Sequence, residues 1–236
     1  MRSKKPALFR ALLATALICS SFAGVTVSSG QDLVSFPTTD GGRIYADVYG
    51  QGTQAVVLAH GGRFNKESWE AQARILVDAG FLVLALDFRG YGDSSGPGES
   101  DPPAAPLHLD ILGALQYLLA RGADGVGIVG GSMGGSAAAE AVATSGSDEI
   151  SSLILLASGA GEHPELIRPP TLFILARDDL QFDGTPRLVS IQEDYDKVQA
   201  PKELVLLDGS AHAQYLFDTP QGAQAMAVIL AFLSEH

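Results

Sequence analysis

The stretch Gly125-Val-Gly-Ile-Val-Gly-Gly-Ser-Met-Gly-Gly-Ser136 decides the fold class of this chain. Its first half is a short apolar run that is typical of a buried strand, and the small residues after it favour a helix. Ser132 stands at the tight turn between the two, where the flanking glycines leave room that a Cβ would fill. The sequence therefore predicts a strand, a strained turn and a helix, with a serine at the apex of the turn.

Ser132 is the first candidate for a catalytic residue. A serine on such a turn is open to a substrate on one side and to a general base on the other. The backbone N–H of Met133, at the start of the predicted helix, points to where an oxyanion would form. We therefore expect Ser132 to be a nucleophile and Met133 to supply one oxyanion-hole donor.

A second stretch, Gly92-Asp-Ser-Ser-Gly96, fits the same pattern, G-x-S-x-G. It is followed by further glycines and prolines, which exclude a helix directly after the serine. Ser94 is therefore predicted to be a loop residue, and Ser132 remains the nucleophile candidate.

Composition indicates one packed globular domain. Of the 236 residues, 46% are hydrophobic and 18% are charged, and this balance is not that of a disordered chain. The formal net charge is −12. A charge of this sign disfavours nucleic acid and anionic membrane surfaces as partners.

The first 23 residues have the three-part pattern of a secretory signal peptide. A basic start precedes the apolar run 11–18, and Ser21-Phe-Ala23 places small residues before a cut at Gly24. We expect a signal peptide over 1–23, a single domain over 24–236 and export to the periplasm or the exterior, with an uncleaved N-terminal anchor as the alternative. The single cysteine, Cys19, lies in this leader, and no other stretch is apolar enough for long enough to cross a bilayer.

Beyond the leader, strand-like and helix-like segments alternate. This alternation predicts an α/β fold, with a mostly parallel sheet of about eight strands and helices on both faces. Segment 43–49 alternates like a half-buried strand and is expected to pair with 33–36. The other expected strands are 55–59, 81–86, 125–129, 152–157, 171–175 and 203–207, and the expected helices are 68–79, 107–121, the segment after Ser132, 186–198 and 221–233.

A serine nucleophile needs a base and a carboxylate that orients the base. His212 follows the last predicted strand in a flexible loop, where an imidazole could reach Ser132 at the carboxyl edge of the sheet. Two adjacent carboxylates, Asp178 and Asp179, follow the preceding strand. We favour Asp179 as the orienting acid, with Asp178 as the alternative and Asp183 as a distant third.

The sequence supplies no ligand set for a metal or cofactor. The paired aspartates could in principle hold a metal, but no second cluster of ligands accompanies them. Gly125-Val-Gly127 is not followed by a dinucleotide-binding fingerprint, and no phosphate-binding G-x-x-x-x-G-K-[ST] loop occurs. We therefore expect neither a metal nor a cofactor.

Five ordered motifs resemble those of the α/β-hydrolase superfamily, from about Leu33 to the C-terminus. They are His60-Gly-Gly62, Asp87-Phe-Arg-Gly-Tyr-Gly-Asp-Ser94, the turn at 130–134, Ala176-Arg-Asp-Asp179 and Gly209-Ser-Ala-His212. The chain looks like a compact serine esterase or dienelactone-hydrolase-like member. The resemblance implies the triad Ser132, Asp179 and His212, and an oxyanion hole of Met133 and Gly62, with Arg63 as the alternative to Gly62. It also implies that His60 and Arg89 hold loops in place.

The expected activity is cleavage of carboxylic esters through an acyl-enzyme. The connector 158–170 is too short for a cap domain, so the site is expected to be open and to suit small or exposed acyl substrates. A thioesterase, an aminopeptidase-like acyl hydrolase and a perhydrolase share the same triad and are alternatives. A secreted binding protein on the same fold, without turnover, is an alternative from another class.

Overall fold

The computed structural model describes residues 30–146 and 148–236. The expected signal peptide over 1–23, with Cys19, lies outside these residues. No helix in the described part of the chain is long and apolar enough to span a membrane.

Within the described residues, eight strands form one sheet in the order β1-β2-β4-β3-β5-β6-β7-β8. β2 runs antiparallel to β1 and β4, and every other neighbouring pair is parallel. The predicted fold class is confirmed, as is the pairing of 33–36 with 43–49. The strands are β1 (Gln31–Pro37), β2 (Arg43–Tyr49), β3 (Gln54–Ala59), β4 (Leu82–Leu86), β5 (Gly125–Gly131), β6 (Ile150–Leu156), β7 (Thr171–Ala176) and β8 (Lys202–Leu207).

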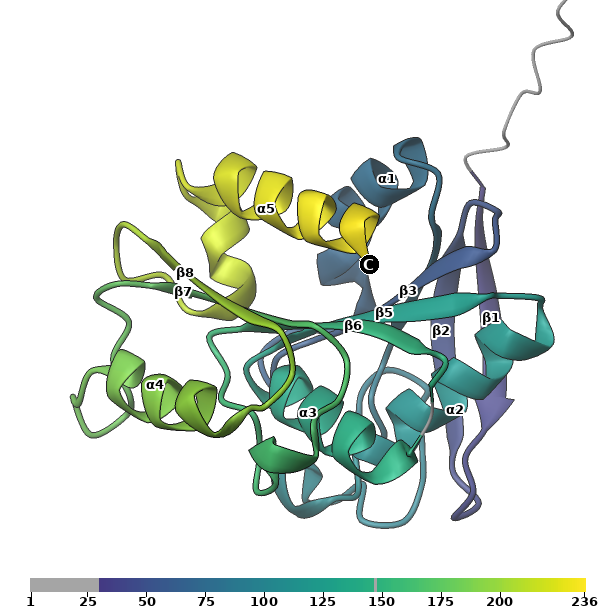
Figure 1. Cartoon of the computed structure of the whole chain (residues 1–236). Helices are drawn as coiled ribbons and strands as arrows, with labels where there is room; N and C mark the ends of the chain where they lie inside the picture. Colours follow the sequence, from purple (N-terminus) through teal and green to yellow (C-terminus); the bar gives the residue numbers. More distant parts are fainter. Residues whose placement is uncertain (1–29, 147) are drawn as a thin grey trace, which may run out of the picture.

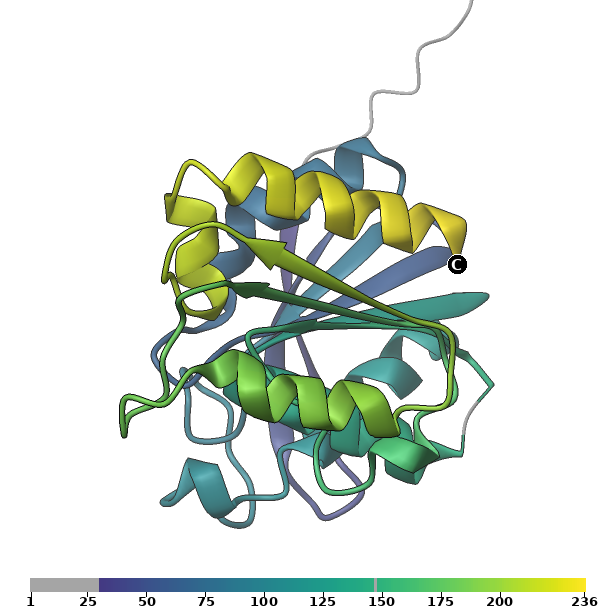
Figure 2. The same cartoon turned by 60° about the vertical axis from the view of Figure 1, so that its left-hand side comes forward.

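Helices cover both faces of this sheet (Figure 1). α1 (Glu70–Asp78) and α5 (Gly222–Glu235) lie on one face, and α2 (His108–Ala120), α3 (Met133–Ser145) and α4 (Arg187–Lys197) lie on the other. The turned view keeps α5 above the sheet and α4 below it (Figure 2). The predicted helix 68–79 begins as a 3₁₀ turn over Lys66–Trp69 and becomes α-helical only at Glu70.

The central strands are buried on both faces because the helices of each layer pack against them. Every residue of β4 and β7 is buried, which explains the continuous apolar sequences of β4 and of β7 after Thr171. One hydrophobic cluster joins the sheet to α2, α3 and α4, and a second joins it to α1 and α5. The sheet is therefore the middle of three layers.

The connector between β6 and β7 contains a single 3₁₀ turn, Pro164–Leu166, within the described residues. It carries no inserted domain over the carboxyl ends of the strands, as its length predicted.

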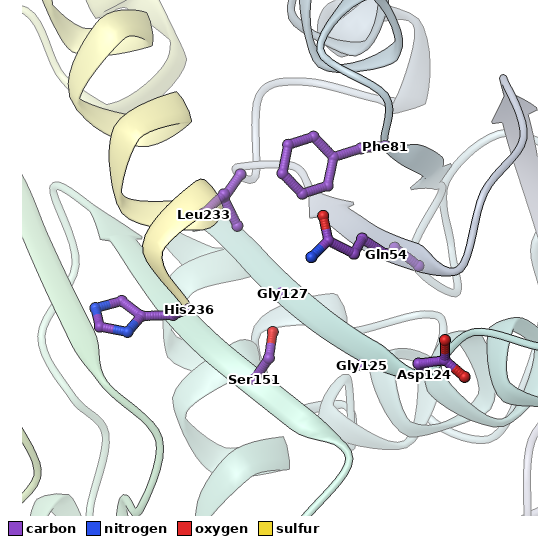
Figure 3. Close-up of a pocket in the computed structure, with 9 residues that line it drawn as sticks. Gln54, Phe81, Asp124, Gly125, Gly127, Ser151, Leu233 and His236 are labelled. Carbon is purple, nitrogen blue, oxygen red and sulfur yellow. The ribbon is translucent and has the colours of Figure 1, made fainter.

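A pocket of about 220 Å³ lies at the edge of the sheet where β3 and β5 begin, opposite the carboxyl ends of the parallel strands (Figure 3). Gly125 and Gly127 form part of its lining, and Leu233 of α5 projects toward it. A Cβ at Gly127 would lie 2.5 Å from the Leu233 side chain, so the missing side chain lets α5 pack against β5. This pocket is remote from the ends of the strands that carry the candidate site.

Arg89 anchors the loop that follows β4. Its side chain is fully buried and pairs with the buried carboxylate of Asp110 and with Asp40. It also donates a hydrogen bond of 2.9 Å to the carbonyl oxygen of Pro97. These contacts give Arg89 the loop-holding position that the resemblance implied. Ser94 also lies in this loop, where its hydroxyl accepts the Tyr45 N–H at 2.8 Å.

Candidate active site

Ser132 occupies the sharp turn between β5 and α3. Its φ of 50° and ψ of −115° lie in a region that residues with a Cβ rarely adopt, at a cost of about 1–3 kcal/mol. The backbone holds the turn there, since the Ser132 N–H donates to the Leu156 carbonyl at 2.9 Å and its own carbonyl accepts the Ser136 N–H at 3.0 Å. The turn thus combines local strain with fixed hydrogen bonds.

The glycines around Ser132 are required by close backbone contacts. A Cβ at Gly130 would overlap the carbonyl oxygen of Gly134, within the turn itself. A Cβ at Gly134 would overlap the carbonyl oxygens of Ala59 and His60, at the end of β3. The glycines of G-x-S-x-G are therefore needed because α3 packs closely against the ends of two strands.

Ser132, His212 and Asp179 form a hydrogen-bonded chain. His212 Nε2 lies 2.8 Å from Ser132 Oγ, and His212 Nδ1 lies 2.7 Å from Asp179 Oδ2. A carboxylate only accepts, so Nδ1 carries the imidazole proton and Nε2 is left to accept the serine hydroxyl. The three residues follow β5, β8 and β7, so the parallel sheet brings them to one edge.

The two adjacent aspartates after β7 differ sharply in environment. The carboxylate of Asp179 is only 3% exposed and faces His212, whereas Asp178 is exposed. Asp183 instead accepts hydrogen bonds from Thr185 in the following turn. The structure therefore places Asp179 beside the histidine, and not Asp178 or Asp183.

Arg187, which the sequence analysis did not single out, also binds Asp179. Its Nε donates to Asp179 Oδ2 at 3.1 Å, and its backbone N–H donates to the Asp179 carbonyl at 3.0 Å. The same carboxylate oxygen thus accepts from both His212 and Arg187. No sequence motif marks this arginine, because the turn between β7 and α4 brings it back to the aspartate.

The candidate oxyanion donors lie beside Ser132. Met133 is the first residue of α3, and the first N–H groups of a helix have no acceptor within it. Gln214, a second residue that sequence reasoning missed, holds the loop of Gly62, since its Oε1 accepts the Gly61 N–H at 2.7 Å. In the described part of the chain, the amides of Gly62 and Arg63 donate to no other group. Both residues line the same cavity as Ser132.

His60 holds the end of β3 against the end of β4. The ring Nδ1 lies 2.9 Å from the Gly61 carbonyl, and Nε2 accepts the Phe88 N–H at 3.2 Å. One nitrogen therefore donates and the other accepts, which is the pattern of a neutral imidazole. Burial lowers the pKa of His60 to about 4, and the hydrogen bond to Gly61 only partly offsets this.

Acid should destabilise the fold through His60. Its pKa is lowered from 6.5 to about 4 on folding, so the unfolded chain binds this proton more readily. The free energy of unfolding should therefore fall as the pH drops from 6.5 toward 4, by up to about 3 kcal/mol from this ring. Urea unfolding at several pH values between about 7 and 4.5 measures the slope.

The matched variants are His60→Gln and His163→Gln. The first removes the buried titrating ring and should flatten the slope in this pH range, although Gln is also expected to lower stability at neutral pH. The second changes an exposed ring, 59% accessible, and should keep the slope of the wild type. Equal slopes in the wild type and His60→Gln would contradict the assignment.

A cavity of about 570 Å³ opens onto Ser132, within the size range of small-molecule sites. No group of three or more His, Cys, Asp or Glu side chains suited to a metal occurs among residues 30–146 and 148–236. The cavity lining is mostly apolar, with two arginines; it consists of Gly61, Gly62, Arg63, Phe64, Tyr91, Ser132, Met133, Leu180, Gln181, Phe182, Arg187, His212, Ala213 and Tyr215.

Comparison with known proteins agrees with this architecture. The family described as alpha/beta hydrolase fold matches residues 54–221, which is most of the chain. An esterase from Pyrococcus furiosus superposes with a TM-score of 0.72 at 18% identity, covering 87% of this chain and 91% of that one. At this identity the likeness concerns the fold alone.

Curated relatives match shorter segments. The chain is 32% identical over 152 residues to non-heme chloroperoxidase CPO-A1 from Kitasatospora aureofaciens, covering 63% of this chain and 48% of that protein. It is 42% identical over 79 residues to epoxide hydrolase A from Mycobacterium tuberculosis, covering 32% and 24%. The chain thus spans less than half the length of these relatives.

Proposed function

We propose that this chain, which belongs to the alpha/beta hydrolase fold family, is a serine hydrolase that cleaves carboxylic esters of small or exposed substrates. The observation that carries the proposal is the hydrogen-bonded chain from Asp179 through His212 to Ser132 at the mouth of one cavity. A binding protein would have no need for a strained serine with a base at 2.8 Å.

In the proposed mechanism, Ser132 Oγ attacks the ester carbonyl carbon while His212 Nε2 takes the hydroxyl proton. The amides of Met133 and Gly62 stabilise the oxyanion, and Asp179 stabilises the imidazolium. Collapse of the tetrahedral intermediate breaks the carbon–oxygen bond to the alcohol, which leaves with the proton from His212. Water, deprotonated by His212, then attacks the acyl-enzyme and releases the acid and Ser132.

The open site supports the proposed substrate size. Among the described residues, no inserted domain covers the carboxyl ends of the strands, and loops that follow the strands bound the cavity. His212 is about one third exposed, so a substrate reaches the base without a lid opening. An acyl group carried on a larger molecule could enter the site equally well.

Hydrolysis of a matched panel of acetyl substrates tests the proposal. Phenyl acetate, phenyl thioacetate and acetanilide differ only in the atom that joins the acetyl group to the phenyl ring, which is oxygen, sulfur or nitrogen. We expect the highest kcat/KM on the oxygen ester, and turnover that depends on Ser132. A faster thioester or amide would favour a thioesterase or an aminopeptidase-like hydrolase. No turnover of any substrate by folded protein would favour a binding protein without catalysis.

A perhydrolase is the second candidate, favoured by the similarity to the chloroperoxidase. A carboxylic acid would acylate Ser132 with release of water, and hydrogen peroxide would then attack the acyl-enzyme, giving a peracid and free Ser132. The peracid would oxidise halide to hypohalous acid and return to the carboxylic acid. Adding acetate, peroxide and bromide to the enzyme and following bromination of a dye tests this. Bromination that requires both Ser132 and acetate would support the perhydrolase. The absence of bromination would favour the esterase.

A further inference from the structure

We propose that the turn at 180–186 forms one wall of an acyl-chain site, and that Phe182 at its tip sets the preference for chain length. The inference rests on the proposed ester cleavage and names its substrate class: esters with an apolar acyl chain of medium length. The turn joins β7 to α4 and protrudes beside α4 (Figures 1 and 2).

The turn is tied by its own hydrogen bonds. The Gln181 N–H donates to the Thr185 carbonyl at 2.8 Å, and Leu180 pairs with Pro186 in an antiparallel bridge. Asp183 Oδ1 accepts both the backbone N–H and the hydroxyl of Thr185, at 3.0 and 2.7 Å. The loop is therefore a small hairpin with a defined shape, and Phe182 is presented at its end.

Hydrogen bonds also hold the hairpin against Asp179 of the candidate triad. It begins directly after Asp179 and ends at Arg187, whose side chain and backbone both bind Asp179. Arg187 Nη2 in addition donates to the Leu180 carbonyl at 3.2 Å. The position of Phe182 relative to the reacting serine is thus fixed by the residues that hold the acid of the triad.

Exposed apolar side chains gather around this cavity. Phe182 is fully exposed, Leu180 is 53% exposed and Tyr215 is 43% exposed, and all three line the same cavity as Ser132. The rings of Phe64 and Tyr215 lie 4.7 Å apart and complete the apolar lining. A single exposed apolar residue needs no explanation, but several around one cavity mark a binding surface.

Because the cavity is continuous with Ser132, its occupant is part of the ester, and we assign it to the acyl chain, which the chain-length series below varies while the alcohol stays the same. An acyl chain that lies against Phe182 in this cavity is bonded to the carbonyl carbon that Ser132 attacks. A separate partner bound at Phe182 would occupy the same cavity and would still have to leave Ser132 accessible. The cavity of about 570 Å³ has the size of a small-molecule site. The net charge of −12 opposes docking of this face on an anionic lipid surface.

The expected effect follows from burial of methylene groups. A methylene fully withdrawn from water would raise kcat/KM about fourfold. Because Phe182 and Leu180 leave one wall exposed to solvent, we expect only about 1.5- to 1.6-fold for each methylene. Octanoate has six more methylenes than acetate, so kcat/KM should rise about 10- to 20-fold between these two esters. Phe182→Ala removes the exposed wall and should reduce this ratio to about 2–5, while Phe182→Leu should restore part of it.

The experiment measures kcat/KM on p-nitrophenyl acetate, butyrate, hexanoate and octanoate, at concentrations below those at which the esters aggregate. Val189→Ala is the matched control, because Val189 is 58% exposed on α4 and does not line the cavity. It should keep the chain-length ratio of the wild type. Because Phe182 and Val189 are exposed, both proteins are expected to fold, and their circular dichroism spectra check this.

If the ratio of kcat/KM on octanoate to kcat/KM on acetate were the same in Phe182→Ala as in the wild type, the inference would be overturned. A flat profile in the wild type would also overturn it, while Ser132-dependent turnover of acetate would leave the proposed ester cleavage standing. Activity that rises only when the esters aggregate, and loses this rise in Phe182→Ala, would assign the patch to a lipid surface and so overturn the acyl-chain site.

Discussion

Ser132→Ala is expected to lower kcat/KM for p-nitrophenyl acetate by about 10⁴- to 10⁶-fold. The variant keeps the cavity and the oxyanion donors but removes the Oγ that lies 2.8 Å from His212 Nε2. Serine hydrolases that lose the nucleophile retain only the part of catalysis that comes from binding and the oxyanion hole. Steady-state kinetics measures the loss, and circular dichroism shows that the fold is intact.

The matched control is Ser94→Ala, because Ser94 stands in the second G-x-S-x-G stretch. Its hydroxyl accepts the Tyr45 N–H at 2.8 Å and does not line the cavity. The variant should lose about 1 kcal/mol of stability and keep its activity. Substantial activity in Ser132→Ala, with the fold preserved, would refute the proposed nucleophile.

Asp179→Asn is expected to lower kcat by about 10³- to 10⁴-fold, the second largest effect. An amide in place of the carboxylate can donate to Nδ1, which would put the imidazole proton on Nε2 and leave no acceptor for the serine hydroxyl. The change also leaves Arg187 without its charged partner. Kinetics on phenyl acetate at saturating substrate measures kcat.

Asp178→Asn provides the control at the adjacent position. The two substitutions make the same chemical change, but Asp178 is exposed and Asp179 is 3% exposed beside His212. We expect Asp178→Asn to retain activity within about twofold of the wild type. A large loss in Asp178→Asn, with little loss in Asp179→Asn, would reverse the assignment of the acid.

The fold was predictable because its signals are local. Buried strands with parallel neighbours, such as 172–176, are continuous apolar runs, and the turn at Ser132 contains glycines that close backbone contacts require. The alternation of these strands with helical segments fixed the fold class. The start of α1 was less predictable, because the 3₁₀ turn over Lys66–Trp69 precedes it.

The contacts around the candidate site depend on tertiary geometry instead. Whether Asp178 or Asp179 faces the histidine is decided by how the chain leaves β7, and the sequence offered both. Arg187 binds Asp179 only because the hairpin at 180–186 closes on itself. Gln214 reaches Gly61 across 153 positions of sequence, a pairing that no local pattern marks.

Covalent labelling with a fluorophosphonate is the direct test of Ser132 as an activated nucleophile. Phosphonylation requires a serine whose hydroxyl is activated by a base, as the contact between Ser132 and His212 implies. We expect one added phosphonyl group per chain, mapped by mass spectrometry to the peptide that contains Ser132 and absent in Ser132→Ala. A folded wild-type protein that stays unlabelled, or carries the label on another serine, would contradict this assignment.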